Sequence, residues 1–194
     1  IVNRQAAAAV GQSQLMAMYA DHFGAHGVDV GQVLVATGDF DDRARYLNIR
    51  NTLLRLLKHR VVPIINENDA VSIAELKMVD HHSPVFGDND GLSAILASKL
   101  GADLLVLLTD VPGLFERDPN EYPDAQILHR VEEDWSGFEM SAHKSELSRG
   151  GMQTKVEAAH IAVRSGCHAI IASGLDEMAL PRVLSGEDEG TWFV

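Results

Sequence analysis

The chain has 194 residues, of which 46% are hydrophobic and 23% are charged, enough apolar mass for one continuous core. Its formal net charge of -12 argues against nonspecific binding to nucleic acid or to anionic lipid, since both are polyanions. The one cysteine, Cys167, cannot form an internal disulfide, and no apolar run approaches the ~20 residues that span a bilayer. We therefore expect a cytoplasmic protein with no membrane and no nucleic acid partner.

The first half of the chain alternates between helical and extended patterns. Small apolar residues recur at helical spacing near the start, and the β-branched run Val61-Val62-Pro63-Ile64-Ile65 is typical of a strand covered on both faces. In chain order we expect a helix, a strand, a helix, a strand and a strand pair at residues 5–23, 28–36, 39–60, 61–65 and 71–79. The second helix should carry acids in its first turn and bury three leucines, Leu47, Leu54 and Leu57.

The second half continues the alternation. It predicts helices at residues 90–100, 152–165 and 176–184, and strands at 104–108, 127–131, 169–172 and 191–194. Strands alternating with helices imply right-handed crossovers and a largely parallel sheet with helices on both faces. Ligands of such sheets bind beyond the carboxyl ends of the strands, so the polar residues after each apolar run are the first candidates for a site.

Two polar clusters occupy such positions. Asn66-Glu67-Asn68-Asp69 offers four hydrogen-bonding side chains where a turn needs one or two, although turns and a helix cap also account for them. Asp88-Asn89-Asp90 opens the helix at 90–100, where a single aspartate suffices as an N-cap. Crowded aspartates repel each other unless a cation lies between them, so the two clusters together favour a ligand site.

A glycine pair, Gly150-Gly151, precedes the helix at 152–165 and leaves backbone N–H groups bare at its start. Lys155 adds a positive charge there, and a lysine near a helix N-terminus is unfavourable without an anion nearby. We therefore favour an anion-binding loop over a flexible loop with an ordinary surface lysine, although the Walker A spacing is absent. Thr109-Asp110 ends the most apolar strand, and by itself it is an ordinary strand end followed by a turn. It is a candidate for the site only because it lies beside the other strand ends.

Other chemistries find no support in the sequence. Asp80-His81-His82 suggests a metal, but adjacent histidines point apart and no third partner has ligand spacing, so we expect an exposed loop and no metal site. Neither the G-x-S-x-G elbow of hydrolases nor the G-x-G-x-x-G loop of dinucleotide-binding proteins occurs.

Five motifs together resemble the amino acid kinase family, and within it the glutamate 5-kinases. They are Ala9-Val10-Gly11-Gln12-Ser13, Ile65-Asn66-Glu67-Asn68-Asp69-Ala70-Val71, Gly87-Asp88-Asn89-Asp90-x-Leu92-Ser93-Ala94, Leu108-Thr109-Asp110-x-x-Gly113-Leu114 and Gly150-Gly151-Met152-x-Thr154-Lys155. Their order and approximate spacing agree from about residue 4 to the end. The resemblance implies a single domain over residues 1–194, an α/β three-layer sandwich with a mainly parallel sheet.

The resemblance also implies an activity. A γ-phosphoryl group would pass from ATP, with Mg2+, to the side-chain carboxylate of L-glutamate, giving L-glutamyl 5-phosphate, the first step of proline synthesis. The implied substrate-binding residues are Asp69, Asn89, Asn66 and Asp88, and the implied catalytic residues are Lys155 and Asp90, the latter orienting lysines at the phosphate. The implied ATP-binding residues are Thr109, Asp110, Arg149, Gly150, Gly151, Met152, Gln153, Thr154 and Lys155. We also expect a homo-oligomer.

The chain departs from the family pattern in three places. The opening strands, with their K-x-G-[ST]-S loop, are absent, so we expect an N-terminally incomplete copy. Because that loop binds phosphate in the family, this chain by itself is a candidate for an inactive form of the enzyme. The stretch from Asp80 to Phe86 looks longer than in many relatives, and Ser148-Arg149 replaces a glycine and a threonine, making Arg149 a candidate phosphate contact. The alternatives are a module that binds glutamate or proline without turnover, and another acid kinase of this fold, such as an acetylglutamate kinase.

Overall fold

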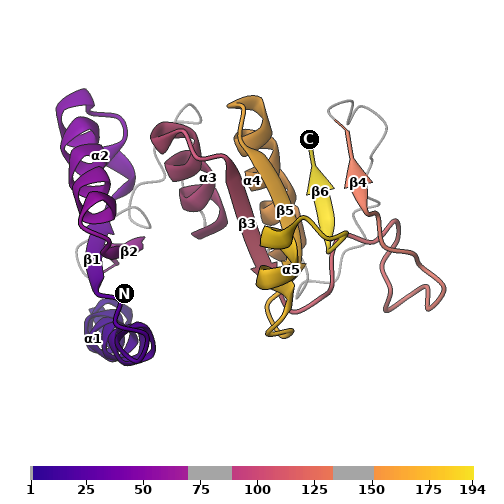
Figure 1. Cartoon of the computed structure of the whole chain (residues 1–194), viewed down its shortest axis with the longest axis horizontal. Coiled ribbons are helices and arrows are strands. Elements are labelled where there is room, and N and C mark those ends of the chain that lie inside the picture. The colour runs from indigo at the N-terminus through magenta and orange to yellow at the C-terminus, as the bar shows by residue number, and fades with distance from the viewer. Residues whose placement is uncertain (1, 70–88, 133–150) are drawn as a thin grey trace. The chain divides into compact units, whose positions relative to one another are not determined.

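A computed structural model describes residues 2–69, 89–132 and 151–194, which fall into two compact units, Ile1–Asn89 and Asp90–Val194 (Figure 1). Several sequence-based predictions therefore lie outside the described residues. These are the strand pair at 71–79, the Asp80–Phe86 stretch with its two histidines, Asp88, Arg149 and Gly150. Among the described helices, none is long and apolar enough to cross a membrane.

The first unit confirms the predicted alternation. Its elements, in chain order, are α1 (Val2–Gly24), β1 (Val30–Val35), the short helix η1 (Thr37–Asp39), α2 (Arg43–Lys58) and β2 (Val62–Glu67). The two strands pair in parallel, with Val30 opposite Val62 and Val35 opposite Glu67. α1 packs on β1 and α2 packs on β2. The backbone N–H of Asn68 bonds to the carbonyl of Val35, so the chain just after β2 is tied to the end of β1.

Helix α2 corrects two expectations. It begins at Arg43 rather than near residue 39, because Asp42 caps it by accepting a hydrogen bond from the backbone N–H of Arg45, so the acids precede the first turn. Its buried side is formed around Leu53, which is fully buried, whereas three leucines predicted to be buried are exposed, namely Leu47, Leu54 and Leu57. Leu53 directly precedes Leu54 in an apolar stretch of the helix, and periodicity alone does not say which of the two faces the sheet.

The second unit contains a four-stranded sheet. Its elements are α3 (Asn89–Leu100), β3 (Leu104–Thr109), β4 (Arg130–Val131), α4 (Gly151–Arg164), β5 (His168–Ser173), α5 (Ala179–Ser185) and β6 (Thr191–Phe193). The strand order is β3-β5-β6-β4, with β5 and β6 antiparallel and the other two pairs parallel. Every strand and helix predicted for this half is present, although the strand expected at 127–131 is reduced to β4 and an isolated bridge between Phe115 and Ile127.

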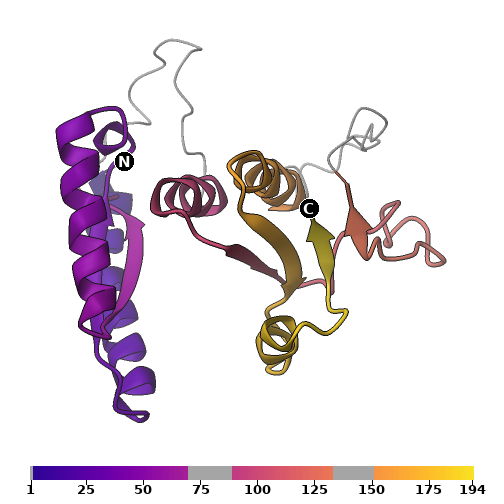
Figure 2. The same ribbon diagram turned by 45° about the horizontal axis from the view of Figure 1, so that its top comes forward.

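Helices cover both faces of this sheet, giving the three layers that the sequence predicts (Figure 2). Residues of α3 and α4 pack on one face against Leu105 and Leu107 of β3. On the other face Val183 of α5 packs among Leu104 and Val106, the intervening residues of the same strand. Successive side chains of a strand point to opposite faces, so β3 serves two separate cores.

Candidate functional site

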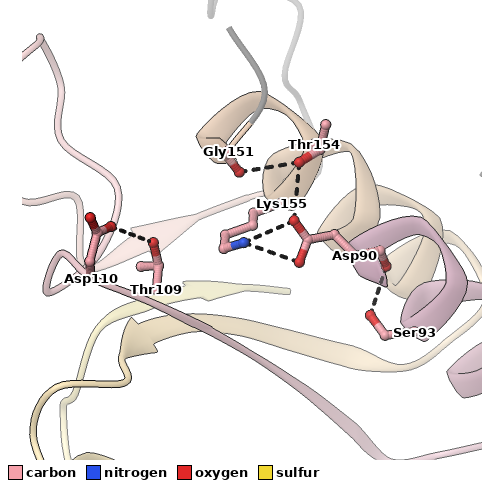
Figure 3. A network of polar contacts seen from close by, with 7 residues as sticks. All are labelled: Asp90, Ser93, Thr109, Asp110, Gly151, Thr154 and Lys155. Atoms are coloured by element: carbon pink, nitrogen blue, oxygen red, sulfur yellow. Dashed lines mark hydrogen bonds and ion pairs between the residues drawn. The ribbon is translucent and has the colours of Figure 1, made fainter. Parts of the chain in front are cut away.

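The topology of the second unit gathers the predicted polar residues at one edge of the sheet. α3 leads into β3, and α4 leads into β5, which runs parallel to β3. Because each helix runs back against the strand that follows it, both helices begin beside the carboxyl ends of β3 and β5. Thr109 and Asp110 lie at that end of β3. Figure 3 shows them together with Asp90 near the start of α3 and Lys155 near the start of α4.

Asp90 and Lys155 form an ion pair that joins α3 to α4. The Lys155 Nζ atom lies 2.9 Å from Oδ2 and 3.1 Å from Oδ1 of Asp90, so the ammonium contacts both carboxylate oxygens (Figure 3). The side chains of lysine and aspartate are only 14% and 18% exposed. The carboxylate therefore supplies the negative charge that a lysine close to a helix N-terminus requires. Lys155 is thus not an ordinary surface lysine, the alternative that the sequence left open.

Thr154 holds the same carboxylate from a second direction. Its hydroxyl lies 3.0 Å from Asp90 Oδ2 and 3.2 Å from the carbonyl oxygen of Gly151, one turn earlier in α4. A hydroxyl has one proton, and a charged acceptor binds it more strongly than a carbonyl, so the geometry favours donation to Asp90. The backbone of Asp90 is fixed as well, because the Ser93 hydroxyl donates to its carbonyl oxygen at 2.7 Å.

The turn after β3 is held rigidly by β6. The Thr109 hydroxyl donates to the Asp110 carboxylate at 3.1 Å. Four residues after Asp110, the backbone N–H of Leu114 donates to the buried Thr191 hydroxyl oxygen at 2.8 Å. A Cβ atom on Gly113 would lie 2.7 Å from that oxygen, so only glycine fits there. No local pattern indicates a role for Thr191, because its partner lies 77 positions away in the chain.

Three other predicted ATP-binding residues occupy the start of α4. Gly151 opens the helix, as the glycine pair suggests. Met152 packs against the core under α3 and α4, and Gln153 donates to Glu157 at 3.0 Å on the exposed side of the helix. Backbone N–H groups, rather than these two side chains, are what this helix start offers to an anion.

The first unit contains a second polar cluster at the end of β2. Asn66 donates through Nδ2 to Oε1 of Gln12, in α1, at 3.1 Å, and it accepts from the backbone N–H of Glu67 at 2.9 Å. Asp69 is exposed in the turn that follows, and Asn89 is exposed at the first position of α3. Gln12 belongs to one of the quoted motifs, but sequence reasoning assigned it no role, since a polar residue in a helix usually faces solvent.

Residues 1–173 match the sequence profile of the Amino acid kinase family. The chain belongs to this family. Among its relatives are proteins named glutamate 5-kinase from Bradyrhizobium diazoefficiens (46% identical over 98% of this chain), Rhodopseudomonas palustris strain BisB18 (45% over 98%) and Marinomonas sp. strain MWYL1 (45% over 97%). The chain covers 49% of each of these three, so it spans about half the length of the curated relatives it matches.

Solved structures of two other kinases are similar in fold to this chain. An isopentenyl phosphate kinase in complex with its substrate is 21% identical, with a TM-score of 0.63 over 94% of this chain and 67% of that one. UMP kinase from Ureaplasma parvum is 13% identical, with a TM-score of 0.55 over 92% of this chain and 65% of that one. At these identities the likeness establishes the fold alone, and it confirms the predicted α/β architecture with a mainly parallel sheet.

Proposed function

We propose that the protein transfers the γ-phosphoryl group of ATP to the side-chain carboxylate of L-glutamate, producing L-glutamyl 5-phosphate for proline biosynthesis. The observation that carries the proposal is the Lys155 ammonium, which Asp90 fixes at the edge of the sheet where β3 ends. Phosphoryl transfer brings two anions together, and its catalysis consists mainly of positioning and of neutralising charge. Relatives of this chain that are 45–46% identical carry the name glutamate 5-kinase, which supports glutamate as the acceptor.

Each predicted site residue has a role in this proposal. Lys155 stabilises charge on the migrating phosphoryl group, and Asp90 orients it. The nucleotide lies along Thr109 and Asp110 and along residues 149–154, which include the first turn of α4. Glutamate is held by four polar residues, Asp69, Asn89, Asn66 and Asp88. Asp69, just after β2, and Asn89, at the start of α3, are both exposed, so their side chains are accessible to a ligand.

We propose Mg2+ as the partner of ATP. This ion binds oxygen donors, commonly one or two carboxylates together with substrate phosphates, and it neutralises phosphate charge. The exposed carboxylate of Asp110, at the end of β3, has the right chemistry to hold it. Lys155 then acts on the phosphate as a second, protein-derived positive charge.

We also propose that the protein forms a homo-oligomer through α2. Leu47, Leu54 and Leu57 lie on one stripe of this helix, and each exposes more than a third of its surface. Burying such leucines against the same stripe of a second copy removes apolar surface from water. Light scattering on a Leu54→Glu variant should then show a smaller species than the wild type, and an unchanged mass would contradict this interface.

The activity is tested with the full-length product of the gene, Mg-ATP and hydroxylamine, which traps an acyl phosphate as a hydroxamate. We expect hydroxamate with L-glutamate, and far less with L-aspartate or N-acetylglutamate. Turnover with either of those two but not with glutamate would identify another acid kinase of this fold. Glutamate binding without any turnover would identify a non-catalytic module.

A further inference from the structure

The hydrogen bonds around Asn66 determine which way two side-chain amides face. The backbone N–H of Glu67 can only donate, so the Asn66 atom 2.9 Å away from it must be the oxygen, Oδ1. The amide nitrogen of Asn66 therefore faces Gln12, and because that nitrogen is a donor, Gln12 must present its own oxygen, Oε1, at 3.1 Å. The backbone N–H of Glu67 thus determines the orientation of the Asn66 amide, and the Asn66 amide in turn determines that of Gln12.

This orientation leaves the Gln12 amide nitrogen, Nε2, without an acceptor. The atom is buried, and it has no hydrogen-bond partner among the residues that the structure describes. It is also the one buried side-chain nitrogen or oxygen within the described ranges that lacks such a partner. Folded proteins pair nearly all such groups, because burial removes the water that would otherwise accept the hydrogen bond. Since the described residues supply no acceptor, this donor is available to an acceptor on a bound ligand.

The position of Gln12 indicates which acceptor fits. Its partner Asn66 lies at the carboxyl end of β2, the end of a parallel strand at which ligands bind. Uncharged amide donors suit a carboxylate oxygen, whereas the neighbouring carboxylate of Asp69 suits an ammonium group. An amino acid carries both groups on one carbon. We propose that Gln12 is a substrate-binding residue whose Nε2 donates a hydrogen bond to a carboxylate oxygen of the bound amino acid, an inference that rests on the proposed function.

The test compares two substitutions at Gln12 with the same two at Gln14, an exposed residue of the same helix. Gln12→Met keeps the length of the side chain without its donor, and Gln12→Glu exchanges the donor for an oxygen. In the full-length protein we expect both Gln12 variants to raise the KM for glutamate about tenfold or more. Their KM for ATP should stay close to the wild-type value, and Gln14→Met and Gln14→Glu should leave both constants unchanged.

A thermal melt with and without glutamate separates binding from a structural role. If the proposal holds, glutamate raises the Tm of the wild type more than that of Gln12→Met, while ATP raises both equally. A folded Gln12→Met protein with wild-type glutamate KM and glutamate-induced shift would overturn the assignment, as would a Tm lowered equally with and without glutamate. A wild-type protein that neither turns over nor binds glutamate would instead overturn the proposed function, and this assignment with it.

Discussion

The ammonium of Lys155 contacts both carboxylate oxygens of Asp90, a residue 65 positions earlier in the sequence. Each of the two side chains needs the other, because removing one leaves a partly buried charge with fewer partners. The pair also ties the start of α3 to the start of α4. It therefore contributes to stability as well as to the proposed chemistry, and the two contributions can be measured separately.

A double-mutant cycle measures the stabilising part. Lys155→Met and Asp90→Asn should each lower the free energy of unfolding by about 1–3 kcal/mol, because each leaves a partly buried polar group less well satisfied. The double variant should be less destabilised than the sum of the two, with a coupling of about 0.5–3 kcal/mol in urea denaturation. Effects that simply add would show that the contact contributes nothing to folding.

Thr154 should act through Asp90. Thr154→Val removes the hydroxyl that donates to the carboxylate but keeps the shape of the side chain, so Asp90 and Lys155 lose part of their fixed geometry. We expect kcat to fall about tenfold with little change in the KM for glutamate, since a misplaced charge affects the transition state most. Thr154→Ser, which retains the hydroxyl, should restore most of the activity. Equal activity of the valine and serine variants would refute this role.

Asp69 and Asn89 should affect glutamate and not the nucleotide. In Asp69→Ala and Asn89→Ala, the substrate loses a polar partner worth about 1–3 kcal/mol, so the KM for glutamate should rise while ATP affinity barely changes. Asp21→Ala, which removes an exposed carboxylate in α1, is the matched control and should behave as the wild type. If both site variants keep the wild-type KM for glutamate while folded, the substrate site lies elsewhere.

The acid limb of the stability curve should depend on Asp176. The pKa of this carboxyl lies below its usual value of 3.8. The largest cause is a hydrogen bond from the backbone N–H of Met178, and the next is a hydrogen bond from the Arg182 guanidinium. A pKa that is lower in the folded state stabilises the protein above the unfolded-state pKa, and this contribution is lost as the pH falls through the folded-state value.

The stability difference between wild type and Asp176→Asn should therefore be constant near neutral pH and shrink below about pH 4. Glu177→Gln, at the exposed neighbouring position, serves as the control. Urea denaturation at several pH values measures the difference. A gap that stays the same down to pH 2 would argue against the low pKa.

Most of the described elements could be predicted from the sequence, because the strands are short apolar runs and the helices are separated from them by turn residues. The runs that became β3 and β5 are apolar and bounded by polar turns, and Gly24, Gly101 and Gly166 lie at or just beyond helix ends. The buried face of α2 could not be predicted. Leu53 and Leu54 are equally apolar, and only packing against the sheet decides that Leu53 is the buried one. Similarly, the start of α2 depended on a cap, at Asp42, among three nearby acids.

The site shows the same division. Local chemistry indicated Asn66 at the end of a strand, and Asp90 and Lys155 at the starts of two helices. The contacts that position these residues are long-range, such as Thr154 with Asp90 and Gln12 with Asn66, which lie 64 and 54 positions apart. Nothing in a local pattern signals such a partner, so the expectation that Lys155 needs a bound anion missed the carboxylate that already satisfies it.

Steady-state kinetics of Lys155→Met show whether this ammonium neutralises charge during phosphoryl transfer. The control is Lys99→Met, which removes an exposed lysine from the last turn of α3. In the full-length protein with Mg-ATP and L-glutamate, Lys155→Met should lower kcat by about 100-fold or more with both KM values changed only a few-fold, while Lys99→Met keeps wild-type activity. A folded Lys155→Met protein with the kcat of the wild type would contradict the account.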